Sequence, residues 1–238
     1  MNYLAHFVFN HEVCGLPADP YFVAGVILPD LWPRYSRKRR IRWAAVRAAQ
    51  PACAAEHNLR AGLLNHIAVD RAFHILPRFM RWQEAVKTAL ADSALHPAVA
   101  EFTAHAAVEL ALDHHLLQED GQLADRFYNI LRRCDLEFVC ERVAVLGCVQ
   151  TCGLGDVLAQ FIGRRFLRTY ATPQGIQNAL GLVLGMVGVP LPASELLEQA
   201  VTGAVRAVSP YGLWEDLAAV SVADKMAPVV PCGLVIVR

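Results

Sequence analysis

The chain has 238 residues, of which 55% are hydrophobic and 18% charged, and its 22 basic and 22 acidic residues cancel. A chain of this length and apolar content buries a sizeable core, which excludes disorder, and the balanced charge argues against a general nucleic-acid binder. Seven cysteines without a Cys-x-x-Cys pair fit reduced thiols better than a disulfide framework. We therefore expect a globular, cytoplasmic protein.

Targeting and membrane signals are weak in this sequence. Residues 1–6 lack the basic region and the small-residue cleavage site of a signal peptide, so we expect no such peptide. The most apolar run, residues 179–193, is too short to span a bilayer and is interrupted by glycines and prolines. The sequence predicts a protein without a membrane span.

Apolar residues recur with helical periodicity along most of the chain. A short apolar segment covers residues 3–9. The apolar run 21–28 ends at Pro29, where we expect the helix to stop and leave Asp30 in a loop or at the helix end. Further helices are expected at residues 52–76, 79–90, 99–117, 123–134, 136–148, 157–170, 174–186, 195–208 and 213–226.

Strand signals are scarce, because apolar alternation rarely lasts beyond a few residues. The β-branched tail at residues 229–237 predicts a short strand or an ordered coil. The fold prediction is all-α, a single-domain helical bundle over residues 1–238. We expect a metal site in the half at about residues 1–120 and C-terminal helices at about 121–238.

Two of the expected helices carry imidazole and carboxylate groups at steps of four residues. They are His66, Asp70 and His74 in the first helix, and His105, Glu109 and Asp113 in the second. Steps of four place side chains on one face of a helix. Burying an unpaired carboxylate costs several kcal/mol unless it is paired or metal-bound. The stripes predict a metal site between the two helices, with a buried hydrogen-bond network or surface pairs as the alternatives.

Helix geometry limits how these groups can share an ion. Residues eight apart lie about 12 Å apart along the axis, whereas metal–ligand bonds are about 2 Å. One ion therefore takes His66 and Asp70, with Glu109 or Asp113 from the facing helix. A second ion would use His74 and could share Asp70. Mixed nitrogen and oxygen ligands favour Mn, Fe or Zn over Ca or Mg, so we expect one or two such divalent ions.

Residues 34–42 form a basic cluster with two interpretations. One is a solvated surface loop, as most charge runs are. The other is a patch that binds a phosphate or an acidic protein partner, with Arg37, Arg39 and Arg40 as candidate substrate-binding residues.

Five short motifs are spread over about residues 1–190. They are Met1-Asn-Tyr-Leu-Ala-His6, Gly25-Val-Ile-Leu-Pro-Asp30, Gly62 through His66 to Asp70, Glu109-Leu-Ala-Leu-Asp113-His114, and Ile176-Gln-Asn-Ala-Leu. Together they resemble the acyl-carrier-protein phosphodiesterase family, a branch of the HD-like helical metal hydrolases. The pairing of Gly25-x-x-x-Pro-Asp with Gly62-x-x-x-His-x-x-x-Asp also resembles the zinc-dependent phospholipase C group, more weakly.

The first resemblance implies an HD-like bundle and metal-dependent cleavage of the phosphodiester that joins phosphopantetheine to a serine of acyl carrier protein. The residues that match its motifs are His6, Asp30, His66, Asp70, Asp113 and His114. This chain departs from the family's pattern at four positions. These are Val26, Ile67, His74 and Glu109, which stand where the family has Asn, Arg, Asp and Asp.

These observations predict a metal-dependent phosphodiester hydrolase whose partners are a phosphodiester substrate and acyl carrier protein. The predicted metal ligands are His66, Asp70, Asp30, Asp113, Glu109 and His6, and the predicted acid–base catalysts are His114 and His74. The alternatives are a phospholipase C-like hydrolase and a non-enzymatic helical binding protein whose site has drifted.

Overall fold

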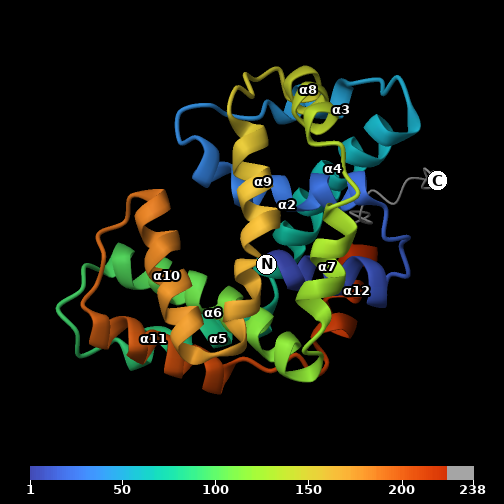
Figure 1. The fold of residues 1–238 in the computed structure, drawn as a ribbon. Helices are drawn as coiled ribbons and strands as arrows, with labels where there is room; N and C mark the ends of the chain where they lie inside the picture. The colour runs from blue at the N-terminus through green and yellow to red at the C-terminus, as the bar shows by residue number, and fades with distance from the viewer. Residues whose placement is uncertain (224–238) are drawn as a thin grey trace.

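A computed structural model describes residues 1–223, and throughout this part of the chain the regular elements are helices (Figure 1). In chain order they are α1 (Tyr3–Val8), η1 (Phe9–Val13), α2 (Pro20–Tyr35), α3 (Trp43–Ala48), α4 (Ala54–His74), α5 (Pro77–Ala89), α6 (Pro97–Glu119), α7 (Leu123–Leu131), α8 (Leu136–Gly147), α9 (Leu154–Arg164), η2 (Phe166–Ala171), α10 (Pro173–Val187), α11 (Ser194–Ala207) and α12 (Leu213–Ala223). The predicted all-α, single-domain class is confirmed. No helix within residues 1–223 combines the length and the apolar character needed to cross a membrane.

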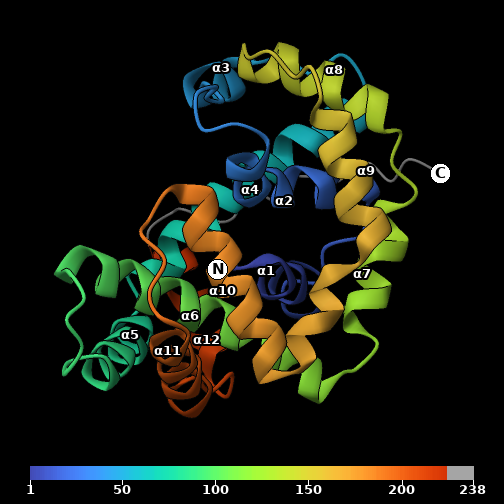
Figure 2. The same cartoon turned by 60° about the vertical axis from the view of Figure 1, so that its left-hand side comes forward.

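The short helix α1 lies in the middle of the fold. In Figure 2, α2 and α4 lie above it, α7 and α9 to its right, and α6 and α10 to its left. All six of its residues are buried. A six-residue helix is too short to be stable in isolation, so its conformation depends on the helices that enclose it.

Pro29 does not stop a helix, contrary to the prediction. Helix α2 runs from Pro20 to Tyr35 and contains both Pro29 and Pro33. An interior proline costs about 3 kcal/mol because it removes a backbone hydrogen bond and crowds the preceding turn. Leu28, Leu31 and Trp32 are buried on either side of this position. Their packing holds the helix together and places Asp30 inside it.

The expected helix at 157–170 is divided in two. Helix α9 ends at Arg164, and Arg165 has a left-handed backbone with φ of +49° before the 3₁₀ helix η2 begins. Such a residue terminates an α-helix. The Arg165 side chain lies 3.3 Å from an oxygen of Asp125 and donates a hydrogen bond to Asn129.

Helix α3 was not predicted. The tail at 229–237, where a short strand or an ordered coil was expected, lies outside the described residues.

Helices α2 and α4 touch backbone to backbone where Gly25 meets Gly62. A Cβ on Gly25 would lie 2.2 Å from the carbonyl oxygen of Leu59, and one on Gly62 would lie 2.1 Å from that of Phe22. This approach is available only to glycine. It sets the separation between the helix that carries Asp30 and the helix that carries His66.

Replacing Gly62 by alanine should therefore destabilise the protein. We expect the free energy of unfolding to fall by about 3 kcal/mol or more, since backbone atoms cannot yield to the new methyl group and the two helices must separate. Gly185→Ala is the matched control: it is also helical, but its Cβ would meet no atom within 4 Å. The free energy of unfolding of the control should rise by about 0.5–1 kcal/mol, because alanine is favoured over glycine inside a helix. Urea unfolding followed by circular dichroism measures both, and equal effects would contradict the close contact.

Candidate metal centre

Imidazole and carboxylate groups from α1, α4 and α6 meet in two groups of three. The first consists of His6, His66 and Asp70, and the second of His74, His105 and Glu109. Within each group the ligand atoms lie within 4.8 Å of one another. The predicted presence of His, Asp and Glu groups able to hold a metal ion is therefore confirmed.

The first group is built around two buried imidazoles. The rings of His6 and His66 stack with their centroids 4.4 Å apart, and both nitrogens of His6 lack a hydrogen-bond partner among the described residues. The Nε2 of His66 lies 3.5 Å from Oδ1 of Asp30. Burial lowers the pKa of His66 to about 4 and that of His6 well below its usual range. Both rings are thus neutral, the form in which histidine ligates a metal.

The second group converges on one oxygen atom. Oε1 of Glu109 lies 2.9 Å from Nε2 of His74 and 3.3 Å from Nε2 of His105. The other ring nitrogen of His74, Nδ1, lies 3.2 Å from Oδ2 of Asp70. His74 therefore links the second group to the first. Burial opposes its ionisation, but the hydrogen bonds to Asp70 and Glu109 outweigh this effect and raise its pKa to about 9.

The α-amino group of Met1 lies between the two groups. Its nitrogen is 2.5 Å from Oδ1 of Asp70 and 3.0 Å from Oε1 of Glu109. Although burial opposes its charge, these carboxylates raise its pKa to about 11. In turn, burial works against ionisation of the carboxylates, but the ammonium holds their pKa values well below the usual range. Sequence reasoning missed this cation because a backbone amine carries no side-chain signature.

Asp113 and His114 lie outside both groups, although both were predicted as site residues. The Asp113 carboxylate accepts hydrogen bonds from the backbone N–H groups of Leu4 and Ala5, at 3.2 and 2.8 Å. Burial raises its pKa to about 7 against the effect of these bonds. Nδ1 of His114 lies 2.7 Å from the carbonyl oxygen of Tyr170. Asp113 thus anchors the helix that carries His6. His105 was not among the predicted ligands, but it belongs to the second group.

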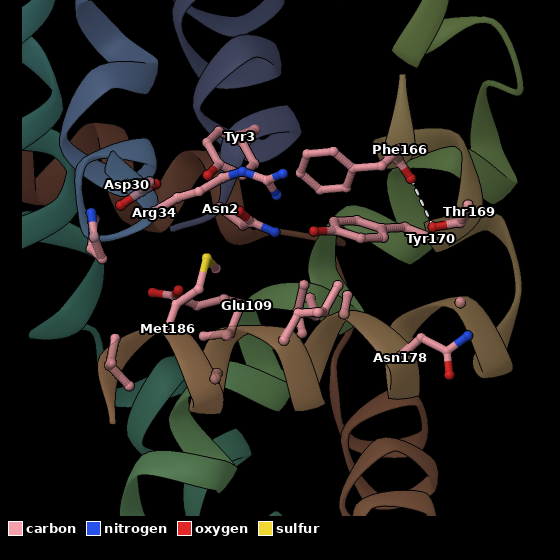
Figure 3. Close-up of a pocket in the computed structure, with 18 of the residues that line it drawn as sticks. Asn2, Tyr3, Asp30, Arg34, Glu109, Phe166, Thr169, Tyr170, Asn178 and Met186 are labelled. Atoms are coloured by element: carbon pink, nitrogen blue, oxygen red, sulfur yellow. Dashed lines mark hydrogen bonds between the residues drawn. The ribbon is translucent and has the colours of Figure 1, made fainter. Parts of the chain in front are cut away.

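A pocket of about 440 Å³ opens beside the two groups, lined by Asp30, Glu109, Arg34, Arg164 and residues of α10. In Figure 3 the carboxylates of Asp30 and Glu109 lie at one end, and Phe166, Thr169 and Tyr170 lie at the other. Asp30 is thus shared, since it faces both the pocket and His66.

The predicted substrate-binding arginines do not line this pocket. Arg39 contacts the Tyr35 hydroxyl and lies 3.3 Å from the carbonyl oxygen of Cys152. The Arg37 guanidinium covers Gly188, where a Cβ would lie 2.6 Å from it, and Arg40 is exposed. The arginine of the basic cluster that does line the pocket is Arg34.

No family model, curated protein or solved structure matches the chain. The resemblance to the phosphodiesterase family and its HD-like fold therefore stays a prediction based on short motifs.

Replacing His74 by glutamine tests the charged link between the two groups. The pKa of His74 is about 9 in the fold and about 6.5 in the unfolded chain, so its pairing stabilises the fold fully below pH 6.5 and loses this effect as the pH rises to 9. We expect the stability difference between wild type and His74→Gln to shrink by about 2–3 kcal/mol over this range.

Urea unfolding in EDTA at several pH values measures this difference. His96→Asn is the control, because His96 is exposed and its hydrogen bond to the N–H of Ala98 is one that asparagine can replace. A difference for His74→Gln that is constant between pH 6.5 and 9 would show that folding does not raise the pKa of His74.

Proposed function

We propose that the protein is a metal-dependent phosphodiester hydrolase whose ion is held by His6, His66 and Asp70. The observation that carries this proposal is the buried His6 ring, whose two nitrogens have no partner among the described residues. Leaving a buried polar group unsatisfied costs about 1–3 kcal/mol. Coordination of an ion by one of these nitrogens would offset that cost.

The donor set fits such an ion. Two neutral imidazoles and one carboxylate suit Zn²⁺, Mn²⁺ or Fe²⁺, and Oδ2 of the adjacent Asp30 also lacks a partner. When bound, the ion would polarise a phosphoryl oxygen and lower the pKa of a bound water toward neutrality.

The remaining residues of the cluster position these ligands. The hydrogen bond from His74 and the Met1 ammonium fix the Asp70 carboxylate from two sides. A hydrogen-bonded partner that orients a metal ligand typically changes metal affinity 10–100-fold when it is lost. We assign His74 this positioning role, since both of its ring nitrogens are engaged.

The resemblance guides the choice of substrate. The phosphopantetheinyl serine diester of acyl carrier protein is the first substrate to assay. A phospholipid headgroup diester, as cleaved by the zinc-dependent phospholipase C group, is the second. Arg34 lies one helical turn beyond Asp30 on α2 and supplies a cation for the phosphate of either substrate.

The second group favours an alternative, a helical binding protein without enzymatic activity. Oε1 of Glu109 already lies within 3.3 Å of the nitrogens of Met1, His74 and His105, so this carboxylate is satisfied without an ion. Such closed networks stabilise many protein interiors. The two proposals differ in whether the first group takes up a metal.

Metal analysis of His6→Ala and Asp70→Asn separates them. Wild-type protein dialysed against Zn²⁺ or Mn²⁺ should retain about one equivalent in the first group, and each variant should bind at least about a hundredfold more weakly. Hydrolysis of bis(p-nitrophenyl) phosphate should fall in parallel, and the His96→Asn control should keep both properties. Wild-type protein that takes up no metal and hydrolyses no diester would rule out the hydrolase.

A further inference from the structure

The pocket beside the metal groups carries positive charge that the protein does not neutralise. Arg34 from α2 and Arg164 from α9 both line it, and neither guanidinium forms a hydrogen bond or ion pair within residues 1–223. Nearby arginines differ, because Arg165 and Arg168 both pair with Asp125. Two guanidinium groups are therefore available to a ligand, and guanidinium binds phosphate oxygens strongly.

Of the two carboxyl groups in the pocket, Glu109 is paired within the second group, and Asp30 lies beside the first group with its Oδ2 unpaired among the described residues. Glu109 faces the Met1 ammonium and His74, and Asp30 faces His66. In Figure 3 the Arg34 side chain extends from α2 away from Asp30 and toward Phe166. An anion placed at the end of the Arg34 side chain is thus separated from the carboxyl group of Asp30.

One wall of the pocket is an apolar stripe of α10. Its members recur with the spacing of a core-facing helix stripe, namely Ala179, Leu182, Val183, Met186 and Val187. Such a stripe usually packs against a neighbouring element, but here the side chain of Leu182 is 63% exposed. Apolar surface that lines a cavity with a few polar groups marks a ligand site.

The size of the pocket limits its occupant. At about 30 Å³ for each water-sized group, a volume of about 440 Å³ holds roughly 15 non-hydrogen atoms. A phosphate group uses five of them. About ten remain for an apolar chain.

We infer that this pocket binds an amphipathic organophosphate, with its phosphate at Arg34 and Arg164 and its apolar chain along α10. The choice of phosphate as the headgroup rests on the proposed hydrolase function. The amphipathic, anionic character of the ligand rests on the pocket alone.

Calorimetric titration of the protein in EDTA tests this inference without any ion or turnover. Octyl phosphate is the probe, and inorganic phosphate, octanol and octanoate are the comparisons. We expect octyl phosphate to bind at least about tenfold more tightly than each of the three, because only it supplies both the apolar chain and a phosphate for two guanidinium groups.

Variants then assign each part of the ligand to its wall. Arg34→Gln and Arg164→Gln should each weaken the binding of octyl phosphate about tenfold. Arg81→Gln removes an exposed arginine outside the pocket and should leave this affinity unchanged. Leu182→Asn should weaken octyl phosphate severalfold and leave inorganic phosphate unaffected. The arginines are exposed or half-buried and unpaired, so these variants should fold, which circular dichroism checks.

Four results would overturn the inference. If octanol binds as tightly as octyl phosphate, the pocket recognises only the apolar chain. If inorganic phosphate binds as tightly, the pocket is an anion site without a role for α10. Equal binding of octanoate would reject phosphate as the headgroup. Octyl phosphate binding unchanged in both arginine variants would place the ligand elsewhere. Because no ion is present, these outcomes are independent of the hydrolase test: metal uptake without selective octyl phosphate binding keeps the hydrolase and rejects this pocket assignment.

Discussion

The contact between α2 and α4 at Gly25 and Gly62 is the constraint on which the site depends. Each glycine lies where a Cβ would strike a carbonyl oxygen of the other helix. Asp30 follows Gly25 by just over one turn, and His66 follows Gly62 by one turn, so this backbone approach brings their side chains within 3.5 Å. Any larger residue at the crossing would move the two helices, and the first metal group with them, apart.

Helix α1 supplies what the other helices lack. Asp113 binds its first backbone N–H groups, and this anchor places His6 beside His66 and the Met1 amine between Asp70 and Glu109. Carboxylates buried together repel unless cations lie among them. Here the ammonium and the protonated His74 supply those cations for Asp70 of the first group and for Glu109 of the second. The neutral His6 and His66 of the first group take no part in this pairing.

The cations of the site lie in two places, with the Met1 ammonium and His74 inside the two metal groups and Arg34 and Arg164 in the pocket. Glu109 pairs with partners inside the second group, whereas Asp30 meets only His66 and its Oδ2 has no partner among the described residues. The guanidiniums of Arg34 and Arg164 also face the pocket without partners in the described chain. The apolar stripe of α10 extends the same pocket. A phosphate-bearing ligand can therefore lie next to the metal groups with its charge facing the two guanidiniums.

The sequence by itself determined the helical class, most helix boundaries and the two stripes, because residues four apart share a helix face whatever the fold. It missed the continuity of α2 through Pro29, since packing on both sides of the proline outweighs its local cost. Only the tertiary structure decided which stripe residues meet. The Asp113 carboxylate accepts hydrogen bonds from the backbone of α1, and His105 lies beside the carboxylate of Glu109. Such choices depend on helix crossings and backbone groups, which leave no periodic signal in the sequence.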